Sequence, residues 1–454
     1  MSPGLAAQTL HAALEFVDTP TPGFGTAAPA TLANGDLSEM TTTFIRWIAV
    51  AITSVAFALG AIMLPSRADD GPESRQANSA TASHSLAVTE KKPMDGKKRS
   101  YSCILLWMSG GPSQTDTFDP KAGNIALFKP MDTNVKGLQF TELFPALAKH
   151  ANHLAIIRSM SHREGDHLRA TYLMRTGYAP GGGVTHPSVA CALAKELSAD
   201  RPDVPRHIAI NPMAMLQLAS SPGFLGPQYG PIKIGGSRFG EPGAGLALPA
   251  VEMFEELAKG KGKVHRDAVA KAFDLTAEKA ETHDAYGKTR FGDGCLLARR
   301  LIETGVPVVE VTLGGWDTHG NAVALTKARA MELDAGLSAP IKDLHERKKL
   351  ETTLIVWMGE FGRTPRINAS AGRDHYPMAF TAMLAGANIK GGQAIGKTSD
   401  DGALINDRSV SPQEFLATIY ESVRIDPRRA NKTDGGQIVP LVERGNNAIK
   451  EALR

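Results

Sequence analysis

Acidic and histidine side chains follow several apolar runs of the sequence, and the fullest set lies within residues 352–377. There the run Leu354–Met358 is rich in β-branched and aromatic residues, which is typical of a strand buried on both faces. Glu360 follows this run closely, and Asp374 and His375 come later in the same stretch. Open α/β sheets place their sites just beyond the carboxyl ends of such strands. These three side chains are therefore candidate metal ligands.

A second set follows the apolar run Val306–Leu313, where Asp317 and His319 stand between glycines. An aspartate oxygen and a neutral imidazole nitrogen are the usual ligands of a zinc-like ion. The two residues are close enough in the sequence to reach one ion. The alternative is an aspartate–histidine hydrogen bond that only orients a turn.

A third set comes after the run Ser102–Met108, which leads through a Gly-Gly-Pro turn to Asp116 and Asp119. Carboxylates in this position can bind a hard or borderline divalent metal. Aspartates also commonly cap a helix or a turn after a strand. The sequence leaves both interpretations open.

His162 and His167 follow a fourth buried run, residues 153–158, and precede a helix that we expect from about Leu168 to Arg175. The N-terminus of such a helix favours bound anions, because its free N–H groups and its dipole point toward them. A histidine there could be a nucleophile, a general acid or a metal ligand. The alternative is a solvated histidine-rich turn.

Two arginines, Arg363 and Arg366, lie just after the strand that precedes Glu360. Guanidinium groups match the oxygens of phosphate and sulfate, so both are candidates to bind an anionic substrate. Arg363, nearer to Glu360, is also a candidate catalytic residue. Either arginine could instead form a surface salt bridge.

The elements that must position these residues are expected to form one sheet, with a single site at its carboxyl edge. The Gly- and Pro-rich stretch 206–240 predicts an elaborated surface loop near the mouth of the site, and residues 251–305 are mostly helical in pattern. Together, residues 207–300 are expected to shape specificity. Ser411, followed by proline and then Glu414, predicts the start of a final helix.

Length and composition indicate an ordinary soluble globular protein of 454 residues, long enough for a large core. The formal net charge of +3 gives no reason to expect a nucleic-acid partner. The three cysteines, Cys103, Cys191 and Cys295, are far apart and lie in apolar surroundings. They predict buried free thiols rather than a disulfide framework.

The N-terminal region carries a signal for export. Arg46 precedes a charge-free apolar run over 47–64, and Pro65, Ser66, Arg67 and Ala68 follow it. Residues 40–68 thus have the pattern of a secretory signal peptide. The run is also barely long enough to remain as a membrane anchor. We expect a periplasmic or extracellular protein, attached to a membrane only if this segment stays uncleaved.

Signal peptides begin at the initiator methionine, so Met40 is the expected start of translation. Residues 1–39, which are rich in Ala, Thr, Pro and Gly, are then a mis-called or disordered extension. Residues 69–98 are polar and are expected to form a disordered linker before the folded body.

Five blocks of the body resemble the DUF1501 family, in the family's order: LLWMSGGPSQTDTFDPK, GGWDTHGN, GEFGRTPRIN, GRDHYP and IKGGQAIGKTSDDGA. The resemblance covers roughly residues 99–445. The family consists of secreted bacterial proteins that are abundant in planctomycetes, and its fold is placed in the alkaline phosphatase/sulfatase-like superfamily. The resemblance therefore implies a three-layer α/β sandwich with a mostly parallel central sheet flanked by helices.

The superfamily hydrolyses phosphate or sulfate esters at a site of one or two metal ions, with a nucleophile at a helix N-terminus. By this resemblance Asp116 or Asp119 matches the first metal aspartate, Asp317 and His319 match a metal-binding pair at shorter spacing, and His375 matches the late histidine ligand. Three positions depart from the pattern. Glu360 stands where the superfamily has Asp, Phe361 stands where it has His, and His167 takes the nucleophile's place instead of Cys or Ser.

We therefore expect a secreted hydrolase that uses a divalent metal such as zinc, calcium or manganese. Its substrate would be an anionic sulfate or phosphate ester, either a small molecule or a polysaccharide. The alternative is that the site has lost catalysis, and that the same fold serves as a binding or surface-associated protein.

Overall fold

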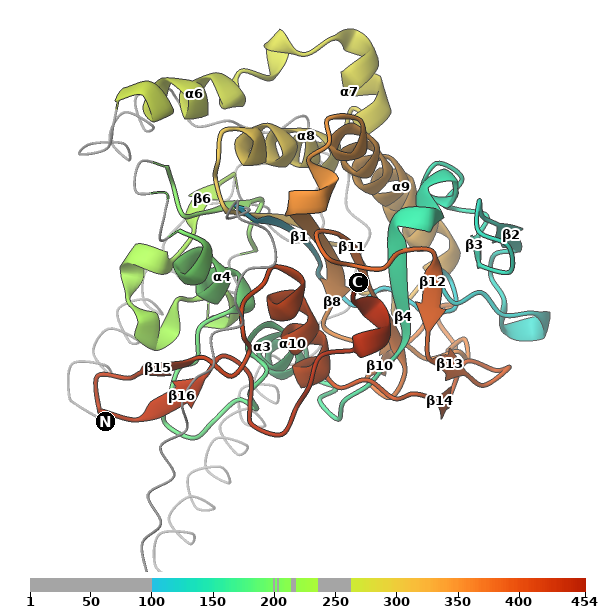
Figure 1. Ribbon diagram of the computed structural model, residues 1–454. Helices are drawn as coiled ribbons and strands as arrows, with labels where there is room; N and C mark the ends of the chain where they lie inside the picture. Colours follow the sequence, from blue (N-terminus) through green and yellow to red (C-terminus); the bar gives the residue numbers. More distant parts are fainter. Residues whose placement is uncertain (1–99, 199–200, 202–203, 214–217, 236–262) are drawn as a thin grey trace, which may run out of the picture. The chain divides into compact units, whose positions relative to one another are not determined.

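The computed structural model describes residues 100–198, 201, 204–213, 218–235 and 263–454 (Figure 1). The chain divides into two units, Met1–Glu90 and Lys91–Arg454, and all described residues belong to the second. The extension, the signal or anchor segment and the linker expected from the sequence lie outside them. Within the described ranges, no helix has the length and apolar character needed to cross a membrane.

A large sheet forms the centre of the described body (Figure 1). Across the sheet its eight strands are, in order, β12 (Gln393–Ile395), β4 (Leu154–Met160), β11 (Phe380–Gly386), β8 (Thr353–Gly359), β1 (Ser102–Met108), β7 (Val308–Leu313), β5 (His207–Ile210) and β6 (Ile232–Ile234). Strand β11 is antiparallel to β4 and β8, and every other pairing is parallel. The mostly parallel sheet predicted from the sequence is confirmed.

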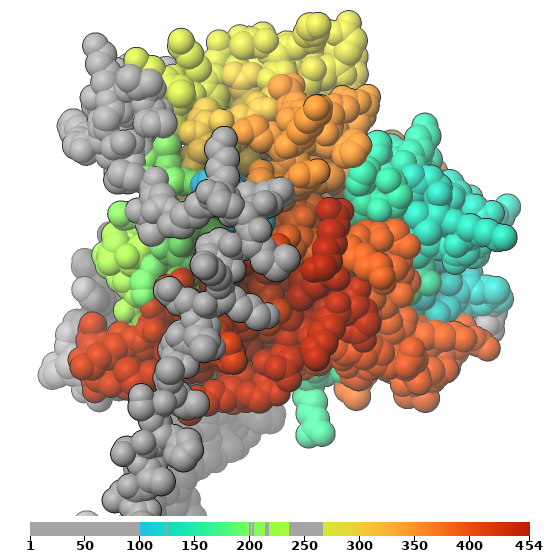
Figure 2. All heavy atoms as spheres, in the orientation of Figure 1, coloured from blue at the N-terminus to red at the C-terminus, as the bar shows by residue number. Residues whose placement is uncertain are grey.

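Helices cover both faces of the sheet, which gives the three expected layers. One face carries α6 (Lys263–Phe273), α7 (Ala280–Tyr286), α8 (Arg290–Glu303) and α9 (Ala322–Glu346); the other carries α3 (His167–Thr176), α4 (Val189–Leu197) and α10 (Pro412–Ser422). Alternate residues of β1 point to opposite faces, so that Leu106 packs in one hydrophobic cluster and Leu105 in the other. Figure 2 shows residues near the C-terminus, in red, gathered on the face where α10 packs.

Short elements complete the described body. The 3-10 helices are η1 (Gly123–Ile125), η2 (Leu147–His153), η4 (Leu218–Ser220), η5 (Gly223–Leu225), η6 (Pro227–Tyr229), η7 (Leu275–Ala277), η8 (Leu350–Thr352) and η9 (Lys450–Ala452). Four two-stranded ribbons pair β2 (Pro130–Asp132) with β3 (Gln139–Thr141), β9 (Gly362–Arg363) with β10 (His375–Tyr376), β13 (Lys397–Thr398) with β14 (Ile405–Asp407), and β15 (Ala430–Lys432) with β16 (Ile438–Pro440).

The structure corrects one expectation about a connecting segment. The stretch 206–240, expected to be an irregular surface loop, supplies β5 and β6 at one edge of the central sheet. The apolar runs here are short and lie between prolines and glycines, which is also typical of loops. The structure shows, however, that β5 is buried along its whole length.

The predicted start of the final helix is confirmed. Ser411 caps α10 in a capping box, since its side chain accepts from the backbone of Glu414 while the Glu414 side chain accepts from the backbone N–H of Ser411. Gly305 follows the end of α8 with a φ of 95°, a conformation that favours glycine. All three cysteines are buried free thiols.

Candidate functional site

The carboxyl ends of the central strands lie side by side and carry the candidate residues. In the parallel register Met108 of β1 pairs with Leu313 of β7 and with Gly359 of β8, so these three strands end at one level. Asp317 follows β7 and Glu360 follows β8, while His167 is the first residue of α3, after β4. One edge of the sheet therefore presents all three.

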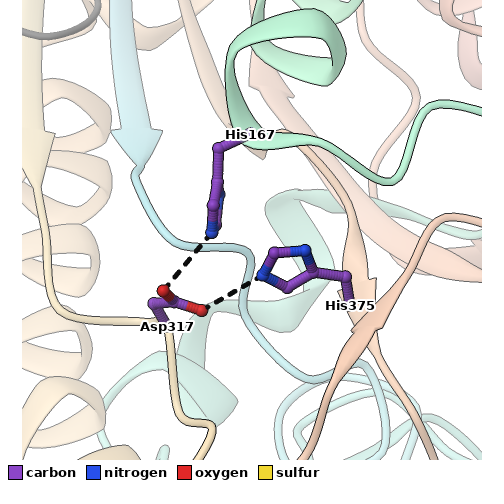
Figure 3. A group of neighbouring side chains, drawn as sticks. All are labelled: His167, Asp317 and His375. Carbon is purple, nitrogen blue, oxygen red and sulfur yellow. Dashed lines mark hydrogen bonds and ion pairs between the residues drawn. The ribbon is translucent and has the colours of Figure 1, made fainter. Parts of the chain in front are cut away.

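Asp317 lies between His167 and His375 (Figure 3). Its Oδ2 is 3.4 Å from Nε2 of His167, and its Oδ1 is 3.4 Å from Nε2 of His375. One ligand atom from each of the three residues lies within 4.8 Å of the others. These atoms could hold one metal ion. In the described part of the chain, no group of His, Cys, Asp or Glu away from this cluster is found to meet this criterion.

His319 belongs to the same cluster. Its Nε2 lies 2.9 Å from Nε2 of His375 and 3.2 Å from Oδ1 of Asp317. Ligand atoms around a tetrahedral zinc ion are about 3.3 Å apart, because each bond is about 2.0–2.1 Å long. The distances among His319, His375 and Asp317 are close to this value, so the three side chains fit a zinc-like ion.

The outward nitrogens of these imidazoles are held by oxygen atoms. Nδ1 of His319 is 2.8 Å from Oδ1 of Asp374, which also accepts from the Asn368 side-chain amide at 3.0 Å. Nδ1 of His375 is 2.8 Å from the carbonyl oxygen of Gly165, which can only accept. A proton on Nδ1 leaves the lone pair of Nε2 directed into the cluster, which is the usual arrangement of metal-binding histidines.

His167 is oriented by a buried carboxylate, since its Nδ1 lies 2.8 Å from Oε1 of Glu360. The same oxygen accepts from the backbone N–H of Gly110 at 2.7 Å. Burial alone would lower the pKa of His167, but its hydrogen bonds to Asp317 and Glu360 and their negative charges raise that pKa to about 9. Burial raises the pKa of Asp317, yet His167, His375 and Arg363 outweigh burial and hold it well below its usual range.

Glu360 and Phe361 are two of the three residues that differ from the pattern expected from the resemblance. The second oxygen of Glu360, Oε2, is buried and has no hydrogen-bond partner among the described residues. Phe361 is buried and cannot bind a metal; its ring lies 4.9 Å from that of His167 and 4.5 Å from that of His375. Phe361 therefore serves as an apolar support for two of the site's imidazoles.

Glycines let separate loops approach closely enough to form the cluster. A Cβ on Gly110, whose φ is 111°, would come within 2.4 Å of the backbone nitrogen of Asp317. A Cβ on Gly372 would come within 2.1 Å of the carbonyl of His319. Because real Cβ atoms do not make such contacts, the glycines before Asp116 and Asp374 have a packing role that spacing alone did not reveal.

Three further predicted residues do not join the metal-capable group. His162 receives the Glu164 backbone N–H at Nδ1, so its Nε2 donates to the carbonyl of Glu360 at 2.7 Å. Arg363 is fully buried and donates to Asp317, with Nη2 2.5 Å from Oδ1. Arg366 is exposed, and no hydrogen bond or ion pair of its side chain occurs among the described residues.

Asp116 and Asp119 are not brought into the cluster, which departs from the expectation that one of them binds the metal. Asp116 forms a two-bonded ion pair with Arg373, at 2.7 and 2.9 Å, and both side chains are fully buried. Asp119 pairs with Lys121 at 3.0 Å and lies 3.6 Å from Nε of Arg158. Cations already neutralise these carboxylates. Sequence reasoning missed Arg373, although it directly precedes Asp374.

A protein-family model described as "Protein of unknown function (DUF1501)" matches residues 100–256 and 249–453. No curated protein matches the chain. Among solved structures, the chain is similar to the lipoteichoic acid synthase LtaP from Listeria monocytogenes, with 10% identity, 72% and 73% of the two chains covered and a TM-score of 0.40. The PsFucS1 sulfatase from Pseudoalteromonas sp. has 12% identity, with 72% of this chain and 68% of that chain covered and a TM-score of 0.40. The C-terminal periplasmic domain of EcEptC from Escherichia coli, in complex with Zn, has 12% identity, with 79% of this chain and 93% of that chain covered and a TM-score of 0.38.

Proposed function

The chain belongs to the DUF1501 family, and from that premise we propose that it is a metal-dependent hydrolase of sulfate or phosphate esters. One observation carries the proposal. Two imidazole Nε2 atoms and a carboxylate oxygen converge at separations of 2.9, 3.2 and 3.4 Å. The outward nitrogen of each imidazole is fixed by an oxygen acceptor. Such an arrangement is suited to holding a metal.

His319, His375 and Asp317 would hold the ion. Two imidazoles and one carboxylate favour zinc or a similar transition metal over calcium, which prefers an all-oxygen site. The bound ion would polarise the ester and stabilise negative charge on its oxygens. The chain's own residues would orient the ester, exclude water from the buried side of the site and move a proton.

Charge in the cluster supports dependence on a metal. Three carboxylates, those of Asp317, Glu360 and Asp374, lie at the cluster; Arg363 contacts Asp317, and the imidazole of His167 contacts Asp317 and Glu360. Even with His167 protonated, the three negative charges outnumber the two positive ones. An anionic ester would be repelled by this surplus of negative charge. Binding therefore requires the positive charge of an ion.

His167 is the residue we assign to proton transfer. Glu360 holds its Nδ1, so Nε2 is the atom that faces the cluster. The hydrogen bonds and negative charges of Asp317 and Glu360 raise the pKa of this imidazole and so favour its protonated form, which has no free lone pair for nucleophilic attack. We therefore favour donation of the Nε2 proton to the leaving oxygen of the ester over a nucleophilic role.

One observation favours the alternative of a non-catalytic binding protein. Nε2 of His167 also faces Asp317, at 3.4 Å from Oδ2. If His167 joined His319, His375 and Asp317 as a fourth ligand, the ion would have no open position, as in structural zinc sites. An ion whose coordination positions are all filled by protein ligands could stabilise a binding surface without supporting hydrolysis.

The setting of the activity is also proposed. The expected signal or anchor at residues 40–68 would send the protein to the periplasm or the cell exterior. Anionic small molecules or polysaccharide esters would be the substrates there. No nucleic-acid partner is expected, and contact with a membrane would run only through an uncleaved N-terminal segment.

The test is hydrolysis of p-nitrophenyl phosphate and p-nitrophenyl sulfate by the zinc-loaded protein. Hydrolysis that is lost in His319→Ala, and that falls about 10²–10⁴-fold in His167→Gln, would support the proposal. His345→Ala is the matched control, because this exposed histidine lies near the end of α9, ahead of the start of β8 and away from the carboxyl edge. Zinc-loaded protein that cleaves neither ester would favour the binding alternative.

A further inference from the structure

Arg363 places a buried positive charge against the proposed metal site. Its Nη2 lies 2.5 Å from Oδ1 of Asp317 and also donates to the carbonyl oxygen of Gly110. Its Nε donates to the carbonyl of Gly111 at 3.1 Å, and its Nη1 donates to the carbonyl of Arg373 at 3.2 Å. These bonds come from three sides of the guanidinium. Its charge therefore cannot swing away when an ion binds nearby.

The backbone of Arg363 is clamped as firmly as its side chain. The buried Gln114 side chain accepts from the Arg363 backbone N–H at 3.1 Å and donates to the Arg363 carbonyl at 3.0 Å. In the β9–β10 ribbon Arg363 pairs with His375, one of the proposed ligands. The guanidinium and the ligand are thus parts of one fixed unit.

Asp317 has one oxygen that must serve both the ion and the arginine. Its Oδ1 faces Nε2 of His319 and of His375 on the side of the proposed ion, and Nη2 of Arg363 on another. A carboxylate oxygen has two lone pairs. One lone pair for the ion and one for Arg363 leave none on this oxygen to bridge a second ion.

The two carboxylates that follow β1 are not free to bind a second ion near Arg363. The carbonyls of Gly110 and Gly111 already accept from its guanidinium. Asp116 and Asp119, which follow the same strand, are paired with Arg373 and Lys121. The guanidinium of Arg363 lies beside these carbonyls, while Asp116 and Asp119 are paired with other cations.

The formal charges of the site also indicate a single divalent ion. The carboxylates of Asp317, Glu360 and Asp374 against the guanidinium of Arg363 leave at most two surplus negative charges, and only one when His167 is protonated, so a single divalent ion is enough to balance them. A second divalent ion would have to bind with no such charge left to offset, and close to a fixed cation that repels it.

We propose that Arg363 takes the place of a second metal ion, so that the site binds one divalent ion and no more. This inference rests on the proposed function, because it requires Asp317, His319 and His375 to hold an ion. It makes Arg363 a positioning residue, which acts through Asp317 and does not bind the substrate as the sequence suggested.

Zinc stoichiometry of the full-length protein tests the inference, measured by calorimetric titration and by elemental analysis after gel filtration in saturating zinc. We expect one equivalent in the wild type and in Arg363→Lys, which keeps the charge. We expect a second equivalent in Arg363→Met. Arg366→Met removes the same charge from an exposed residue of the same loop and should remain at one equivalent.

The outcomes separate the two proposals. Two equivalents in the wild type, or one equivalent in a folded Arg363→Met variant, would overturn the inference and leave the hydrolase proposal standing. No zinc in the wild type would overturn both. If Arg363→Met does not fold, the cobalt-loaded wild type decides. An electron paramagnetic resonance spectrum of isolated ions supports a single ion per site, and a spin-coupled pair overturns it.

Discussion

Asp116→Asn distinguishes a structural role of Asp116 from the metal-binding role suggested by the sequence. Asp116 and Arg373 form an ion pair with both side chains fully buried. The remaining donors of Arg373 bond to the carbonyls of Thr364, Pro365 and Ile125. Asparagine offers one acceptor in place of two, and its amide N–H groups would face the donors of the guanidinium. The arginine would then be left buried without its counter-charge.

The magnitude follows from this loss. Removing one partner of a buried ion pair costs roughly 3–5 kcal/mol in free energy of unfolding. Taking roughly 2 °C per kcal/mol, the low end of the range for large domains, the melting temperature should fall by about 6–10 °C. Differential scanning calorimetry of the wild type and the variant measures this shift. Zinc content per folded molecule should stay unchanged, because Asp116 lies outside the metal cluster.

A double variant provides the control for this prediction. Asp116→Leu combined with Arg373→Met replaces the pair with apolar side chains, and such replacements are often neutral or stabilising. It should recover most of the melting temperature lost in Asp116→Asn. If Asp116→Asn instead keeps its melting temperature and loses its zinc, Asp116 is a ligand and the role assigned to the ion pair is refuted.

Two further predictions concern stability away from the site. Burial lowers the pKa of His207 to about 4. Between about pH 6.5 and pH 4 the unfolded chain therefore binds more protons than the native protein, so the free energy of unfolding should fall by about 3 kcal/mol as the pH drops through this range. Urea unfolding at several pH values measures this free energy, and its dependence on pH should be weaker in His207→Gln. The same dependence on pH in the variant and the wild type would contradict the role given to His207. Ser411→Ala removes the capping box of α10 and should cost about 1 kcal/mol, seen as a lower urea midpoint, while a midpoint equal to the wild type would count against the cap.

Much of the fold could be predicted because buried strands have a recognisable local pattern of apolar residues. The run Leu354–Met358 lies in β8, and Val306–Leu313 contains β7. The same logic placed Asp317, His319 and His375 at one edge, since parallel strands end at a common level. Proximity of these side chains therefore followed from strand order and spacing.

Other features depend on contacts that no local pattern records. The partner of Asp116 is Arg373, 257 positions later, so a carboxylate after a strand looked like a ligand until its counter-ion was known. The inward direction of Arg363 likewise depends on the carbonyls of Gly110 and Gly111, in another loop. Strands β5 and β6 are too short to stand out from their Gly- and Pro-rich surroundings.

The most direct test of the central claim is a crystal structure of the zinc-loaded protein with an anomalous difference map at the zinc edge. We predict one strong peak, about 2.0–2.1 Å from Nε2 of His319, Nε2 of His375 and an oxygen of Asp317. A peak bound to other residues, or none at this cluster in zinc-saturated crystals, would contradict the claim that these three side chains form a metal site.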